Sequence, residues 1–160
     1  MNKINVLFVC LGNICRSPMA EGIFKKVIEK EGLQKYFSID SSGTSRYHIG
    51  ENPDTRAVKT CLDRNVVLDH KGQEFISQDF ATQDYILAMD SSNFANIKLL
   101  QPSTTVRAKI FKMRDFDPAF KGEDVPDPYY GGAEGFCDVF DMLERSSYEL
   151  LHYIRTEHSI

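Results

Sequence analysis

Cys10 and Arg16 are separated by five residues in a stretch whose neighbours suit anion chemistry. An apolar run precedes Cys10, and Ser17-Pro18 after Arg16 is typical of a helix start. In a strand–loop–helix arrangement, backbone N–H groups converge and the helix N-terminus adds partial positive charge, so the loop can hold an anion. We expect the Cys10 thiol to ionise near neutral pH and act as a nucleophile, and the Arg16 guanidinium to match two phosphate oxygens.

The loop between Cys10 and Arg16 contains Gly12 and Asn13, two residue types that tolerate left-handed backbone angles. The spacing alone indicates little, because it arises by chance in many chains. A redox centre, a phosphate-binding loop and a phosphatase are all compatible with these residues. A structural turn with an incidental buried cysteine is the plainest alternative.

The remaining sequence predicts one doubly wound α/β domain over residues 1–160, with a four-stranded parallel sheet and helices on both faces. Strands are expected at 4–9, 36–42, 84–89 and 106–111. Helices are expected at 17–32, where Ser17 and Glu21 resemble a capping box, and at 52–65, 90–100 and 136–154. Ligands bind beyond the carboxyl ends of parallel strands. The loop after the first strand, the loop around Tyr47, Asp90 and the proline-rich segment 115–132 should therefore meet at one edge.

Composition narrows the class of protein. The net charge is −4 without a basic run, which argues against nucleic-acid binding, and no apolar stretch is long enough to span a membrane. The N-terminus leads directly into a strand rather than a signal peptide, so we expect a cytoplasmic protein. The four cysteines and four histidines show no metal-ligand spacing.

Asp127 is the best candidate for the proton donor that phosphate-ester cleavage requires. It lies between Pro126 and Pro128, which stiffen its backbone, and a carboxyl group beside a bound dianion tends to keep its proton. Taken alone, such a segment is more often an ordinary Asp-Pro turn followed by surface tyrosines.

Five stretches together resemble the low-molecular-weight protein tyrosine phosphatase family, in family order and over nearly the whole chain. They are VLFVCLGNICRSPMAE from position 6, DSSGTS from 40, NPDTRAV from 52, ILAMDSSN from 86 and DPYYGG from 127. The resemblance implies that Cys10 becomes a phosphocysteine, that Arg16 binds the phosphoryl group, and that Asp127 serves as acid and then as base. It implies no cofactor, phosphotyrosine proteins or peptides as substrates, inorganic phosphate as product, and possible weak self-association.

The resemblance also implies roles for supporting residues. The backbone amides of Leu11, Gly12, Asn13, Ile14, Cys15, Arg16 and Ser17 would bind phosphate. Ser17 would hydrogen-bond the Cys10 thiolate. Asn13 would hold the loop through Ser17, Ser41 and His70, and Asp90 would brace it through Arg16 or nearby amides. Tyr47 and Tyr129 would grip the aromatic ring of the substrate.

The other three cysteines have different expected roles. The family uses a second cysteine, here Cys15, to trap the oxidised nucleophile as a disulfide. Cys61 and Cys137 lie in amphipathic segments, so we expect both to be small core residues.

Three other functions are known for, or compatible with, a loop of this kind. An arsenate reductase of the same fold needs relay cysteines just after the third strand, and segment 88–97 has none. Phosphoarginine phosphatases resemble this chain but carry threonine where it has Ile14. A non-catalytic phosphate-binding module would not need Cys10, Arg16 and Asp127 together.

Overall fold

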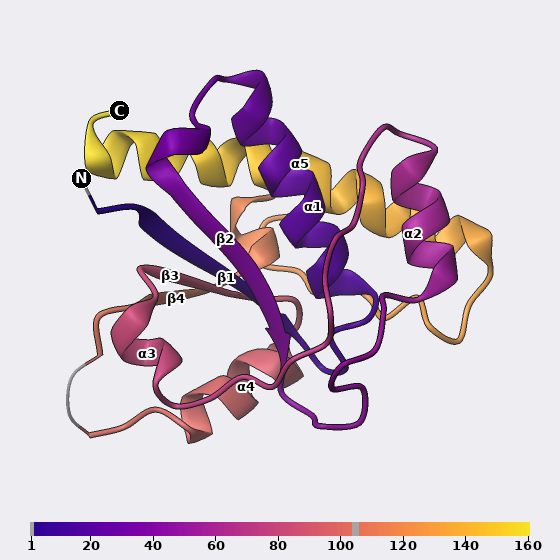
Figure 1. The fold of residues 1–160 in the computed structure, drawn as a ribbon, viewed down its shortest axis with the longest axis horizontal. Coiled ribbons are helices and arrows are strands. Elements are labelled where there is room, and N and C mark those ends of the chain that lie inside the picture. Colours follow the sequence, from indigo (N-terminus) through magenta and orange to yellow (C-terminus); the bar gives the residue numbers. More distant parts are fainter. Residues whose placement is uncertain (1, 104–105) are drawn as a thin grey trace.

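The computed structural model describes residues 2–103 and 106–160 and contains a four-stranded sheet in the order β2-β1-β3-β4 with every pair parallel. The strands are β1 (Ile4–Cys10), β2 (Phe37–Gly43), β3 (Tyr85–Ala88) and β4 (Lys109–Lys112). The helices are α1 (Arg16–Lys30), α2 (Thr55–Leu62), α3 (Asp79–Thr82), α4 (Ser91–Leu99) and α5 (Ala133–His158), and short 3-10 turns lie at η1 (Gln34–Tyr36) and η2 (Met113–Phe116). Figure 1 shows this arrangement.

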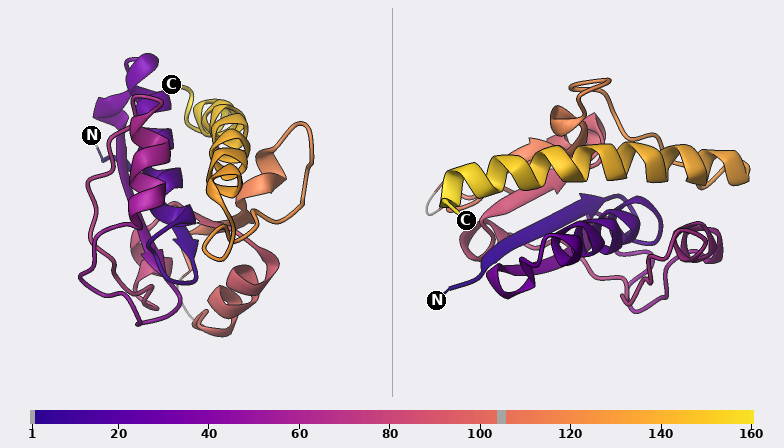
Figure 2. Two further views of the ribbon diagram at one scale, coloured as in Figure 1. Left: turned by 90° about the vertical axis from the view of Figure 1, so that its right-hand side faces the viewer. Right: turned by 90° about the horizontal axis from the view of Figure 1, so that it is seen from above.

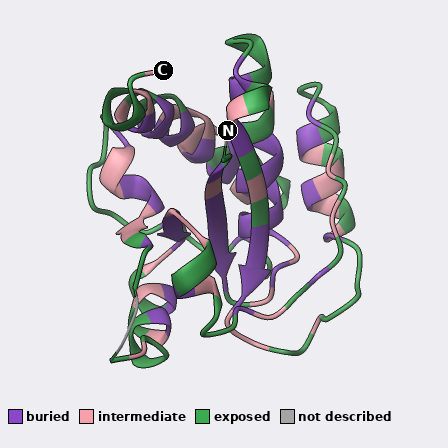
Figure 3. Cartoon of the chain, turned by 60° about the vertical axis from the view of Figure 1, so that its left-hand side comes forward, coloured by how far each residue is buried: buried purple, intermediate pink, exposed green. Residues whose placement is uncertain are grey.

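The central strand β1 is buried on both faces, which explains its continuous apolar sequence. Val6 and Phe8 belong to the larger core beneath α1 and α5, whereas Leu7 and Val9 pack with residues of α3 and α4. Figure 1 and the left view of Figure 2 show α1, α2 and α5 on one side of the sheet and α4 on the other, and Figure 3 shows that the strands at the centre are largely buried. The predicted doubly wound α/β fold, with a four-stranded parallel sheet and helices on both faces, is therefore confirmed.

Several predicted boundaries are wrong, and each has a local cause. The fourth strand begins at Lys109 rather than at Val106, because the amides of Arg107 and Ala108 donate to Phe80 O instead of pairing with β3. The short helix α3 was not predicted. Segment 115–132 opens with part of η2, and α5 starts at Ala133, before the expected residue 136.

The predicted capping box at Ser17 is also wrong. Helix α1 already begins at Arg16, and its N-cap position, Cys15, makes no side-chain capping bond. The Ser17 hydroxyl turns toward the Cys10 sulfur instead, and Glu21 interacts with Lys25 and Ser41. The Ser17 side chain is thereby bound by the Cys10 loop, and the Glu21 side chain by Ser41 of β2 and Lys25 of α1, so neither one caps the helix.

Asp90 caps α4, since its Oδ1 accepts a 2.7 Å hydrogen bond from the Asn93 amide. Asp54 caps α2 in the same way through the Arg56 amide.

The prediction that Cys61 and Cys137 are both core residues is half right, because Cys61 is fully buried but Cys137 is exposed on α5. In the part of the chain that the structure describes, no helix combines the length and apolarity of a membrane span.

Candidate active site

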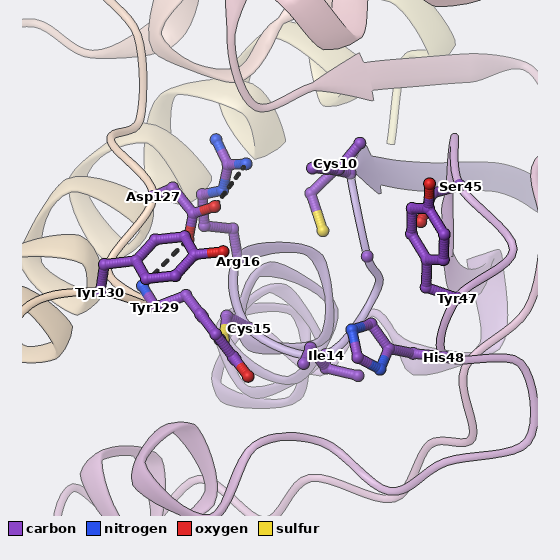
Figure 4. Close-up of a pocket in the computed structure, with 12 residues that line it drawn as sticks. Cys10, Ile14, Cys15, Arg16, Ser45, Tyr47, His48, Asp127, Tyr129 and Tyr130 are labelled. Atoms are coloured by element: carbon purple, nitrogen blue, oxygen red, sulfur yellow. Dashed lines mark hydrogen bonds and ion pairs between the residues drawn. The ribbon is translucent and has the colours of Figure 1, made fainter.

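A cavity of about 270 Å³ lies beyond the carboxyl end of β1, and Cys10, Arg16 and Asp127 all line it (Figure 4). The Cys10 side chain ends the central strand and is only 3% exposed. Its sulfur contacts the Ser17 hydroxyl at 2.9 Å and accepts the Asn13 N–H at 3.2 Å. Both groups can donate to a thiolate, which is the form a nucleophilic cysteine requires.

Asn13 shapes the loop that follows Cys10. Its backbone is left-handed, at φ 58°, and its buried side chain is fully hydrogen-bonded. The Nδ2 group donates to Ser17 Oγ at 2.7 Å and to Ser41 Oγ at 3.1 Å, whereas Oδ1 lies 2.6 Å from His70 Nε2. The structure thus places together the four residues that the resemblance linked, although their contribution to activity stays a prediction.

Arg16 is almost completely buried, and two acceptors fix its Nη1 group. These are Asp90 Oδ2 at 2.6 Å and Val125 O at 2.9 Å, while Nη2 lies 3.8 Å from Asp127 Oδ2. Burial acts to lower the pKa of Arg16, but the nearby Cys10, Asp90 and Asp127 outweigh it and raise that pKa above its ordinary value. The guanidinium is therefore a permanent, oriented positive charge at the cavity wall.

Asp127 lies at the rim of the cavity, with 41% of its side chain exposed. Its Oδ1 accepts the Tyr129 amide at 3.0 Å, so the short Asp-Pro-Tyr turn orients the carboxyl group. Val125, two residues earlier, is fully buried and its amide donates to Met89 O. The segment is thus anchored before Asp127 and open to solvent at Asp127.

Two aromatic walls flank the opening. Tyr129 and Tyr130 stand on one side next to Asp127, and Tyr47 stands on the other side (Figure 4). Tyr47 is 84% exposed and Tyr130 is 92% exposed, so both have apolar surface available to a ligand. The opening of the cavity is therefore bounded by aromatic surface on two sides.

Cys15 also lines the cavity, but its environment differs from that of Cys10. Burial, followed by the negative charges of Asp54, Cys10 and Asp127, raises its pKa to about 12. Cys15 is therefore a thiol, not a thiolate, at neutral pH.

A family profile described as "Low molecular weight phosphotyrosine protein phosphatase" matches residues 5–159. The chain belongs to this family. A protein of that description from Schizosaccharomyces pombe is 43% identical over 153 residues, which cover 95% of this chain and 97% of the relative. A crystal structure of a protein tyrosine phosphatase from Entamoeba histolytica, with Hepes in its active site, matches with a TM-score of 0.91 and 43% identity, covering 98% of this chain and 99% of the other. A Drosophila arginine phosphatase matches with a TM-score of 0.89 and 31% identity, covering 94% and 97%.

In this family member, sequence reasoning missed Ser45 and His48, which line the cavity, and Arg56, which lies beside it. His48 lines the cavity, and its ring lies 3.0 Å from the position that a Cβ on Gly12 would occupy. Arg56 lies over the Tyr129 ring at 5.4 Å and over Phe136 at 4.8 Å, which ties the segment after Asp127 to α2. Arg56 was noted only as part of the family motif from position 52, and no motif marked His48 as a cavity residue.

Two replacements of Asn13 should separate the effect of its left-handed backbone from the effect of its side-chain hydrogen bonds on the loop that follows Cys10. Asn13→Ala loses the amide contacts and places an unfavourable side chain at φ 58°, whereas Asn13→Gly loses only the contacts. We expect both variants to lose kcat/KM for an aryl phosphate, and Ala to be about 1 kcal/mol less stable than Gly in urea unfolding.

Asn65 provides the matched control, since it has φ 62° and lies outside the cavity. Its Ala and Gly variants should show a similar stability difference with unchanged kcat/KM. Unchanged kcat/KM in both Asn13 variants would show that the loop does not depend on this amide.

Proposed function

We propose that this chain hydrolyses phosphotyrosine in proteins or peptides through a phosphocysteine on Cys10. The observation that carries the proposal is the cavity itself, in which a buried sulfur, a fixed guanidinium and a rim carboxyl group face one another. Family membership supports the same reaction.

In the first step, the Cys10 thiolate attacks phosphorus and the bond to the tyrosine oxygen breaks. Asp127 donates its proton to that oxygen, so tyrosine leaves as a neutral phenol. Arg16 and the loop amides of residues 11–17 hold the equatorial oxygens as charge develops, which supplies the stabilisation that phosphoryl transfer requires without a cofactor. Ser17 and the Asn13 amide stabilise the sulfur as a leaving group.

In the second step, water attacks the phosphocysteine and the sulfur–phosphorus bond breaks. Asp127, now a carboxylate, takes the proton of the water, and inorganic phosphate leaves. The rim position of Asp127 supports both roles, because the carboxyl group reaches the cavity and remains accessible to water.

Phosphoarginine is the second candidate substrate, because a Drosophila arginine phosphatase is among the similar structures. The apolar Ile14 side chain and the tyrosine walls favour a phenyl ring over a charged guanidine. Release of phosphate from matched phosphotyrosine and phosphoarginine peptides tests this choice. With a chelator present in both assays, we expect a higher kcat/KM for the phosphotyrosine peptide than for the phosphoarginine peptide. A higher kcat/KM for the phosphoarginine peptide would refute the proposed substrate. A cytoplasmic location and self-association stay predictions.

We also propose that Cys15 protects Cys10 from irreversible oxidation. Peroxide converts the Cys10 thiolate to a sulfenic acid, and the Cys15 thiol then displaces water to form a disulfide. Activity lost to brief peroxide treatment should return with dithiothreitol in wild type, but not in Cys15→Ser. Because the pKa of Cys15 is about 12, the rate of disulfide formation should rise with pH throughout the neutral range.

Peptide mass spectrometry checks this prediction, with Cys137→Ser as a control that should recover like wild type. Sulfonic acid on Cys10 of the wild type, without a linked peptide, would contradict it.

A further inference from the structure

A second polar cluster lies behind the Cys10 loop and contains the side chains of Glu21, Asp40 and His70. Among the described residues, these three form a group whose candidate metal-ligand atoms all lie within 4.8 Å of one another. They come from α1, from β2 and from the segment between α2 and α3. The Glu21 and His70 side chains are nearly buried, at 5% and 7% exposure, whereas Asp40 is 51% exposed and opens the cluster to solvent.

The hydrogen bonds around Asn13 determine which nitrogen of His70 carries a proton. The backbone N–H of Gln73 donates to Asn13 Oδ1 at 2.9 Å, so this atom is an acceptor. His70 Nε2 lies 2.6 Å from the same oxygen and must donate to it. In the neutral ring, Nδ1 therefore presents a lone pair to Glu21 Oε1 at 3.1 Å and to Asp40 Oδ1 at 3.7 Å. Ser41 donates to both carboxylate oxygens, through its backbone N–H to Asp40 Oδ1 and through its hydroxyl to Glu21 Oε1. Nδ1 of the neutral ring is therefore the acceptor without a donor, and it requires a proton or a cation between it and the carboxylates.

The spacing of these acceptors fits a metal ion as well as a proton. With bonds of about 2.0–2.1 Å, the ligand atoms of a tetrahedral zinc site are separated by about 3.3 Å. The two distances from His70 Nδ1, 3.1 and 3.7 Å, bracket that value, and the two carboxylate oxygens lie within 4.8 Å of each other. One imidazole with two carboxylates is also a donor set that favours zinc over magnesium or calcium.

The surrounding groups already orient the three side chains as outer partners of a metal site do. His70 donates its other ring N–H to Asn13, Ser41 Oγ donates to Glu21 Oε1, and the Gln73 side chain donates to Asp40 Oδ2. Lys25 opposes a cation, since its ammonium lies 2.7 Å from Glu21 Oε2.

We propose that Glu21, Asp40 and His70 bind one Zn²⁺ ion, with the fourth position open to water beside Asp40. The ion takes the place of the proton at His70 Nδ1, and that proton goes to solvent. Because His70 also holds Asn13, the bound ion would fix the support of the Cys10 loop from behind, at a place separate from the phosphate cavity.

The test is calorimetric titration of Zn²⁺ into a chain in which Cys10, Cys15 and Cys137 are replaced by serine, so that these thiols do not compete. We expect one bound ion. Asp40→Asn removes the charge of a ligand and should weaken binding by at least about 10-fold, the smallest loss typical even of an outer partner. Asp69→Asn, the matched exposed acid beside His70, should leave binding unchanged. Lys25→Gln should tighten binding by about two- to fivefold, since it removes the opposing charge.

NMR of the histidine ring nitrogens in the wild-type chain is a second measurement, and it does not depend on how the serine variant folds. Zn²⁺ should shift the ring nitrogen signals of His70 before those of His48, His152 or His158. Unmoved His70 signals, zinc bound only by thiols or another histidine, or equal affinity in Asp40→Asn would each overturn the proposal.

Discussion

Replacing Cys10 with serine should reduce kcat for phosphotyrosine by at least about 10⁴-fold. The Cys10 sulfur is placed to accept hydrogen bonds from the Ser17 hydroxyl and the Asn13 amide, but a serine hydroxyl at the same place stays protonated. The substitution therefore removes the attacking group and leaves the anion-binding loop intact. Steady-state kinetics measures the loss, and phosphate binding by calorimetry should persist.

Cys137→Ser is the matched control for Cys10→Ser, because this cysteine is exposed on α5 and does not line the cavity. Its kcat should equal that of wild type. Turnover near the wild-type level in Cys10→Ser would rule out the phosphocysteine mechanism.

Replacing Asp127 with alanine should have the second largest effect, and its size should depend on the leaving group. We expect kcat to fall by about 10²- to 10⁴-fold for phosphotyrosine, because its phenolate leaves poorly without a proton. Nitrophenyl phosphate should be affected much less in the first step, since nitrophenolate is a stable anion. Single-turnover release of the two phenols separates this step from hydrolysis of the intermediate.

Glu123→Ala serves as the control for Asp127→Ala, since it removes an exposed carboxylate from the same loop but not from the cavity. Its kinetics should match those of wild type for both substrates. An equal loss for both phenols in Asp127→Ala would indicate that Asp127 binds substrate rather than protonating the leaving oxygen.

The sheet and the place of the site could be predicted because their signals are local. The apolar run of β1 requires burial on both faces, and the carboxyl ends of parallel strands then bring Cys10, Asp90 and segment 115–132 together. The double use of Asp90, which caps α4 with one oxygen and binds Arg16 with the other, follows from its position at that edge.

Residues that act through distant contacts could not be assigned in this way. His48 lines the cavity because its loop packs against Gly12. The Ser17 hydroxyl contacts the Cys10 sulfur, seven residues earlier in the chain, and does not cap the helix. The exposure of Cys137 depends on which face of α5 meets the core, which a single position does not determine. The family resemblance supplied roles for Ser41 and His70, since neither has a local signal of its own.

Cys10, the proposed nucleophile, terminates a strand that is paired on both sides, with β2 and with β3. The amide groups of β1 are therefore released to solvent only when the sheet as a whole opens, and they should rank among the slowest in hydrogen–deuterium exchange. By contrast, the segment that carries Asp127 lies at the surface with much of its chain exposed. We therefore expect mild heating or denaturant to displace the Asp127 carboxyl group, the proposed acid, while the Cys10 thiol stays in place.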